Sequence, residues 1–272
     1  MKFLSVILLI AFYKNWPSGN LLREKFPLSS WFSWVAGRVQ GENLRIFLSV
    51  LLPSALVFLI SLQLSGFILG FFWLVLSLAV LAYGVVIIDT DIIFDDQVLW
   101  LRGIREGDDL AEAHQAQSNF CGDVIYDVFQ NLVPVLFWFL ILGPAGALFF
   151  ILCQNYLDWM DEEGVESDFL EVSLYWMEWI PSRLTVFLFA LLGDFGRTYQ
   201  VFMTSVFDIE TSVSTTLYES ARCAVGGAET AVSDYEEFAS ATETGLQELK
   251  LLLERSLWGW IGIAALLTIF GL

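Results

Sequence analysis

Long apolar runs with few charged positions dominate the chain. They approach or reach the roughly 20 apolar residues that a helix needs to cross a bilayer. The four clearest are residues 44–62, 67–88, 132–152 and 257–272. A weaker run, 169–193, is interrupted by Glu171, Glu178 and Pro181, and the stretch 3–12 is short for a crossing. The pattern predicts an all-α, multi-pass transmembrane helical bundle with about 4–6 membrane segments and helical cytoplasmic regions.

A retained first helix is expected rather than a cleaved signal, because no small-x-small cleavage pattern follows it.

Arginine and lysine mark the cytoplasmic side of a membrane protein. The segments 14–43, 89–131 and 197–256 all carry them, whereas 153–168 has six acidic residues and neither basic type. We therefore expect cytoplasmic segments at about 14–43, 89–131 and 197–256. They would belong to a single integral membrane domain, residues 1–272, whose connection 153–168 lies outside.

The last of these segments reads as a helix. Residues 230–256 are rich in Ala, Glu, Leu and Lys, which favour helices. Leu246, Leu249, Leu253 and Leu257 follow a three- and four-residue spacing and predict one apolar face. The helix is expected to continue into the final apolar run.

Charge and motifs exclude several classes of function. A formal charge of −18 argues against nucleic acid, because an acidic surface repels a phosphate backbone. His114 is the only histidine, and the three cysteines form no CxxC pair. No GxSxG, GxxxxGK[ST] or GxGxxG motif occurs. No metal and no cofactor are expected.

Two sites within the apolar runs stand out. Leu142-Gly-Pro-Ala-Gly-Ala-Leu148 predicts a kink or a tight helix contact. Arg183 and Asp194 are separated by eleven positions, which places them within about 20° of each other on a helix, with Arg197 one turn on. Such a polar stripe indicates either a pocket between helices for a ligand or partner, or simply the two interfaces of a short span.

Three stretches of the chain are distinctive: EWIPSRLTVFLFALLGDF from Glu178, VPVLFWFLILGPAGALFFIL at 133–152, and LLERSLWGWIGIAALLTIFGL at the C-terminus. They resemble the AmpE family, inner-membrane proteins of Gram-negative bacteria. The family is distantly similar to the CobD/CbiB synthases of cobalamin synthesis, which share the "LFW" span and a W-[IL]-P-x-R-L block. Trp179, Pro181, Arg183 and Leu184 match that block here. Downstream of Asp194 the Asn-Ala-Gly-rich and Gly-Gly-Pro segments of the synthases are missing.

The resemblance implies a multi-pass protein of the bacterial inner membrane that modulates β-lactamase induction, alongside peptidoglycan recycling. It implies that the protein, embedded in the lipid bilayer, acts through a small ligand (a muropeptide or nucleotide) or through a cytosolic recycling amidase. A homo-oligomer is left open. The alternative is a cobinamide-type synthase, so whether the protein is an enzyme also stays open. The ligand-binding candidates are Arg183, Asp194, Arg197, Glu178, Trp179, Pro181 and Asn131.

Overall fold

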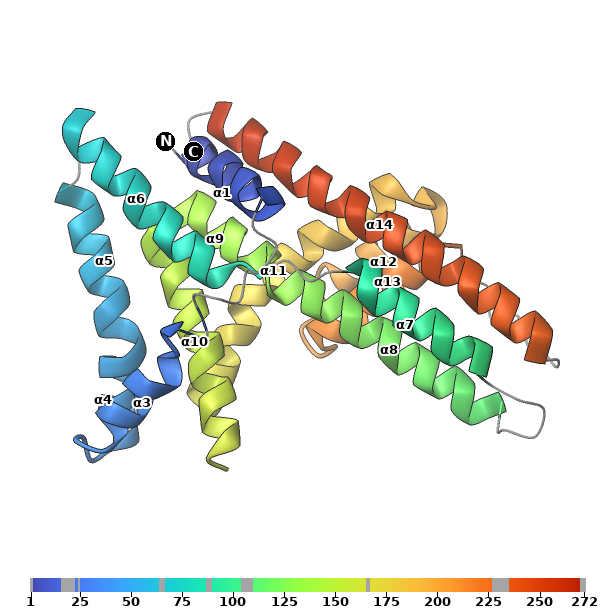
Figure 1. Cartoon of the computed structure of the whole chain (residues 1–272), viewed down its shortest axis with the longest axis horizontal. Coiled ribbons are helices and arrows are strands. Elements are labelled where there is room, and N and C mark those ends of the chain that lie inside the picture. Colours follow the sequence, from blue (N-terminus) through green and yellow to red (C-terminus); the bar gives the residue numbers. More distant parts are fainter. Residues whose placement is uncertain are drawn as a thin grey trace. The chain divides into compact units, whose positions relative to one another are not determined.

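The described part of the chain is entirely helical in its regular structure. The computed structural model describes residues 2–15, 23, 25–63, 67–86, 90–103, 110–164, 167–226 and 235–269. Every secondary-structure element within these residues is a helix, which confirms the all-α class. The elements (Figure 1) are α1 (Lys2–Asn15), α3 (Leu28–Ala36), α4 (Glu42–Ile46), the π-helix η1 (Phe47–Leu51), α5 (Leu52–Gln63), α6 (Phe67–Gly84), α7 (Thr90–Gly103), α8 (Leu110–Gln130), α9 (Val133–Leu142), α10 (Pro144–Glu162), α11 (Asp168–Leu192), α12 (Phe195–Ser205), α13 (Val213–Ala224) and α14 (Tyr235–Ile269).

These helices form two compact units. Unit 1 comprises Met1–Ile87, Gln130–Glu178 and Ile261–Leu272, and unit 2 comprises Ile88–Phe129 and Trp179–Trp260. The boundaries at 178/179 and 260/261 fall inside α11 and α14, so each of these helices contributes to both units.

Helix α10 is the centre of unit 1, where it contacts α3, α5, α6 and α9. Phe150 and Ile151 of α10 are fully buried in one apolar cluster with Leu81 of α6 and Phe139 of α9. Burial of large aliphatic and aromatic side chains on this scale is the main stabilising contribution to such a core. The core of unit 1 therefore forms around α10, which begins at Pro144, directly after Gly143.

The apolar run 132–152, expected as one crossing, is divided into two helices. Gly143 has a φ of 72°, a conformation that favours glycine, and Pro144 begins α10. The ten residues of α9 extend only about 15 Å, half of the hydrocarbon thickness. A Cβ at Gly146 would lie 2.8 Å from the Trp138 carbonyl oxygen, so α9 and α10 are tightly packed there. The tight contact is confirmed, and the run forms two helices instead of one, because α9 ends at Leu142.

Helix α3 packs against the far end of α10. The Phe32 ring lies 4.9 Å from that of Tyr156 and 6.1 Å from that of Trp159. Contacts of this length cannot bridge a hydrocarbon layer of about 30 Å. Helix α3, from the segment 14–43, and the end of α10, from the segment 153–168, therefore meet at one end of unit 1; the sides of the membrane expected for the two segments stay predictions. The cytoplasmic location of 14–43, 89–131 and 197–256 stays a prediction.

In unit 2, helix α14 confirms the predicted apolar face. Leu246, Leu249 and Leu253 are buried, and the helix continues without a break into the final apolar run. Helix α13 packs against α12. The backbone near Gly259 of α14 lies against the Leu188 side chain of α11, where an added Cβ would come within 2.7 Å of it.

Two helices in the described residues are long and apolar enough to cross a membrane. They are Glu42–Gln63, which joins α4, η1 and α5, and Ala111–Leu142, which joins α8 and α9. A shorter apolar helix spans Gly70–Gly84. By length and composition this indicates a membrane protein only weakly, and the predicted 4–6 membrane segments are not confirmed.

Candidate functional site

The predicted polar stripe does not form, because α11 ends before it is complete. The helix stops at Leu192, and α12 begins at Phe195. Between them Gly193 lies so close to the end of α13 that an added Cβ would be 2.5 Å from the Ala224 carbonyl oxygen. The Asp194 amide donates to that same oxygen at 2.9 Å. A glycine is required here by the close approach of two backbones, and this approach breaks the helical register on which the stripe depended.

Asp194 and Arg197 form a helix cap. The Asp194 carboxylate accepts a hydrogen bond from the Arg197 amide at 3.2 Å, as an N-cap residue does. The two side chains also form an exposed ion pair with 3.5 Å between Nε and Oδ2. Arg197 donates further to the Gly226 carbonyl oxygen at 3.4 Å. Exposed pairs of this kind contribute little beyond fixing the local turn.

Arg183 lies elsewhere in unit 2, buried at 5 % exposure. Its Nε donates to the Ser205 carbonyl oxygen at 3.1 Å, and its Nη2 donates to the Asp208 carbonyl oxygen at 2.8 Å. Its Nη1 donates to the Ser182 hydroxyl at 3.1 Å. The guanidinium also lies 5.0 Å from the ring centroid of Trp179, within cation–π range. Arg183 therefore holds the connection between α12 and α13 against α11.

That connection is ordered further by Asp208. Its carboxylate accepts from the Thr211 hydroxyl at 2.5 Å, from the Glu210 amide at 2.9 Å and from the Thr211 amide at 3.1 Å. These hydrogen bonds hold the pKa of the Asp208 carboxyl below its usual range, and the bond from the Thr211 hydroxyl has the largest effect. The charge of Arg183 adds a smaller effect in the same direction. The Trp179 indole donates to the Asp208 carbonyl oxygen at 3.2 Å. We name Trp179, Arg183 and Asp208 the loop clamp.

Pro181 has a structural consequence one turn earlier on α11. Proline has no amide hydrogen, so within the helix it cannot bond to the carbonyl oxygen of Met177. That oxygen instead accepts a hydrogen bond from the Trp138 indole of α9 at 3.0 Å. Trp138 belongs to the "LFWF" stretch and Pro181 to the "WIPSR" stretch. This hydrogen bond thus links Trp138, in one of the three stretches that carry the family resemblance, to the residue directly before another of them.

Glu178 and Asn131 belong to unit 1 rather than to the loop clamp. Glu178 is 3 % exposed, and its carboxylate accepts from the Gln130 side-chain amide at 3.2 Å. The Asn131 carbonyl oxygen accepts from the Val86 amide at 3.2 Å. The seven candidates therefore fall into separate groups, and their role in ligand binding stays a prediction.

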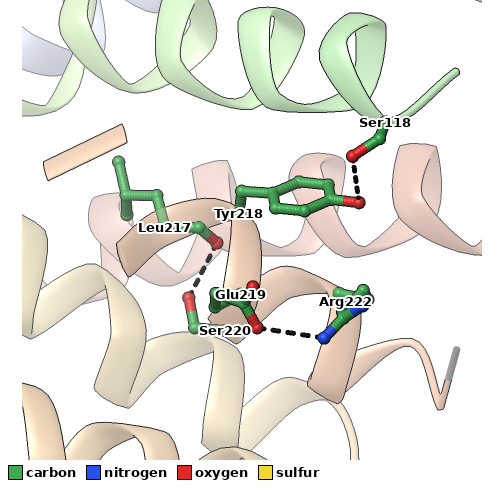
Figure 2. A network of polar contacts seen from close by, with 6 residues as sticks. All are labelled: Ser118, Leu217, Tyr218, Glu219, Ser220 and Arg222. Carbon is green, nitrogen blue, oxygen red and sulfur yellow. Dashed lines mark hydrogen bonds and ion pairs between the residues drawn. The ribbon is translucent and has the colours of Figure 1, made fainter. Parts of the chain in front are cut away.

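A further polar network joins α13 to α8 within unit 2. Figure 2 shows the Tyr218 hydroxyl of α13 accepting a hydrogen bond from the Ser118 hydroxyl of α8 at 2.8 Å. On the next turn Arg222 pairs with Glu219 at 3.1 Å. A cleft of about 140 Å³ beside this network is lined by Tyr218, Cys121 and Gln117 among others. No motif predicted this network, because hydroxyl pairs between distant helices leave no local pattern.

Metal binding has no candidate in the described residues, since no three His, Cys, Asp or Glu side chains gather in a way that could hold an ion.

The comparisons with known proteins bear on the chain's family. The family model described as "Regulatory signalling modulator protein AmpE" matches residues 111–271. No curated protein and no solved structure matches the chain. The matched range covers more than half of the sequence and contains Trp138, Pro181 and the loop clamp. The chain therefore belongs to the AmpE family of regulatory signalling modulators.

Proposed function

We propose that the protein is a multi-pass protein of the bacterial inner membrane that modulates β-lactamase induction, in connection with peptidoglycan recycling. The match to the regulatory AmpE family is the observation that carries this proposal. The proposed action is non-catalytic: the protein responds to a small ligand, such as a muropeptide or nucleotide, or to a cytosolic partner, such as a recycling amidase.

Exposed apolar surface supports the membrane location. In the most apolar window of Glu42–Gln63 only 22 % of the residues are buried. Leu56, Leu59 and Leu62 are each more than half exposed, as are Phe71 and Phe72 of α6. A water-soluble protein rarely exposes large contiguous apolar patches, whereas a lipid-facing helix does so by necessity.

The loop clamp supports a role for the α12–α13 connection in partner binding. This connection presents Phe207 at 87 % exposure and Ile209 at 58 %. Large apolar side chains held outward on an ordered loop are typical of contact sites for other proteins. In this proposal Arg183 acts by positioning the loop rather than by contacting a ligand, because its donors already serve the loop's carbonyl oxygens.

The proposal is tested by complementation of a strain that lacks the gene, with a β-lactam-induced reporter as readout. Phe207→Ala should abolish modulation while leaving the amount of protein in the membrane unchanged, because the side chain is almost fully exposed. Arg183→Ala should also abolish it, by releasing the loop. Arg38→Ala, which removes an exposed arginine that belongs neither to the loop clamp nor to the ligand-binding candidates, serves as the matched control and should retain modulation.

Two results would count against the proposal. Full reporter modulation by Phe207→Ala would eliminate the loop as the contact site. A reporter that does not respond to deletion of the gene would eliminate the regulatory role itself. Thermal-shift measurements on the purified protein with muropeptides, nucleotides and corrinoids then separate a signalling ligand from the cobinamide-type alternative, since only the latter requires corrinoid binding.

A further inference from the structure

Unit 1 contains an open cleft where α3, α4 and α10 meet. Its volume is about 370 Å³, within the range of roughly 300–1,000 Å³ that is usual for small-molecule sites. Arg45 and Glu42 come from α4, and Tyr156, Trp159 and Glu163 lie on or directly after α10. The cleft thus combines one guanidinium, two carboxylates and an aromatic wall.

The charged groups of the cleft are available for a ligand. Arg45 donates its Nε hydrogen to the Val39 carbonyl oxygen at 2.8 Å, and within the described residues its two NH₂ groups make no further hydrogen bond. The exposed carboxylates of Glu42 and Glu163 form no ion pair with any described residue. The Tyr156 hydroxyl lies within electrostatic reach of both Arg45 and Glu42. The cleft therefore offers donors for an anion beside acceptors for a cation.

The position of the cleft indicates where its ligand comes from. It lies at the polar start of the apolar helix Glu42–Gln63, whose Leu44 and Phe47 are about half exposed. Beside it, α3 exposes Trp31 and Trp34, whose stacked rings are 5.3 Å apart. Amphipathic tryptophans at the end of an apolar helix are typical of the level of lipid headgroups.

We propose that this cleft binds the headgroup of a zwitterionic phospholipid with a primary ammonium group. The phosphate meets the NH₂ groups of Arg45, and the ammonium meets the carboxylates of Glu42 and Glu163. The acyl chains follow the exposed apolar face of the helix that begins at Glu42. A primary ammonium is favoured over a quaternary one because only the former has N–H groups to donate to the carboxylates. The proposal rests on the membrane location proposed above.

Native mass spectrometry of the full chain released from detergent micelles tests the proposal. The probes are dioctanoyl phosphatidylethanolamine, the matching phosphatidylcholine, and soluble glycerophosphoethanolamine. We expect the ethanolamine lipid to bind about tenfold more tightly than the choline lipid, since hydrogen bonds to charged groups have about this effect. The double variant Glu42→Gln with Glu163→Gln should lose this preference.

Glu162→Gln is the matched control, because it makes the same charge change on the neighbouring residue, which does not line the cleft. It should keep the tenfold preference. Equal affinity of the wild type for the two lipids, or loss of the preference in Glu162→Gln, would overturn the proposal. Soluble glycerophosphoethanolamine that binds as tightly as the lipid would overturn the assignment to a lipid.

A parallel measurement separates this proposal from the membrane location on which it rests. Membrane flotation of the expressed wild-type chain should place it with the lipid fraction. A chain that fails to float would refute the membrane location and the lipid site together. A chain that floats but shows no lipid preference would refute the lipid site alone.

Discussion

The hydrogen bond between Trp138 and Met177 predicts an energetic coupling between Trp138 and Pro181. In the wild type the Met177 carbonyl oxygen is served by the Trp138 indole at 3.0 Å, because Pro181 has no amide hydrogen. Trp138→Phe removes the indole donor and leaves this buried oxygen without its partner. In a Pro181→Ala background the restored helical N–H bonds to the same oxygen. The decrease in the free energy of unfolding caused by Trp138→Phe should then be smaller than in the wild-type background.

The size of the coupling follows from the cost of an unsatisfied buried carbonyl, about 1–3 kcal/mol. Trp138→Phe also loses packing against its neighbours, including the Phe137 ring at 5.2 Å, but that loss occurs in both backgrounds and cancels in a double-mutant cycle. We therefore expect Trp138→Phe to be less costly by about 1–2 kcal/mol when residue 181 is alanine. For a chain of this size this corresponds to a difference of roughly 3–6 °C in Tm.

The assay is thermal unfolding of the four purified proteins in one detergent, followed by circular dichroism. Trp258→Phe serves as the control, because Trp258 is 69 % exposed and makes no hydrogen bond to any described residue. Its effect should add to that of Pro181→Ala. Additive effects of Trp138→Phe and Pro181→Ala would refute the reasoning, because they would show that the indole bond does not replace the one that proline removes.

Three further outcomes follow from unit 1 and unit 2. Asp208→Asn should lower the Tm at neutral pH. Hydrogen bonds lower the pKa of this carboxyl below its ordinary value of 3.8. In a Tm–pH series the difference in Tm between the wild type and Asp208→Asn should therefore be complete above pH 3.8 and should fade as the pH falls through the lowered pKa. Gly193→Ala should destabilise the protein strongly, whereas Gly245→Ala, with open space at its Cβ position, should be neutral or stabilising by up to about 1 kcal/mol in the same assay. Single cysteines replacing Arg38 and Glu163 in a cysteine-free background should react with an impermeant maleimide from the same side of intact cells; opposite sidedness would contradict the packing of α3 on α10.

Local patterns predicted the elements whose structure depends on neighbouring residues in the sequence. The apolar face of α14 was predicted from leucine spacing, since a 3.6-residue period is a local property. The run 132–152 was predicted as one crossing because hydropathy measures length and not backbone direction. Its glycine and proline did indicate a disturbance, but only the φ of 72° at Gly143 distinguishes a break from a kink.

The site was harder to predict because its partners are backbone atoms far along the chain. Arg183 was singled out as an ionisable residue in apolar surroundings. Its acceptors are the carbonyl oxygens of Ser205 and Asp208, and every residue type carries a carbonyl oxygen, so the sequence holds no sign of them. The helical-wheel argument that joined Arg183 to Asp194 assumed a continuous helix, and the close approach of Gly193 to Ala224 ends that helix.

The geometry of α11 changes what its sequence block implies about chemistry. Each distinctive residue of the block already has a structural role. Pro181 leaves a carbonyl oxygen that Trp138 serves, while Trp179 and Arg183 hold the α12–α13 connection. These roles fix how α11 packs and do not require a substrate. If the block were catalytic, Arg183→Lys should abolish activity without moving the loop. A lysine lacks the planar guanidinium that donates to two carbonyl oxygens at once. If the block positions the loop, Arg183→Lys should therefore change both the protease sensitivity of residues 206–212 and the reporter modulation.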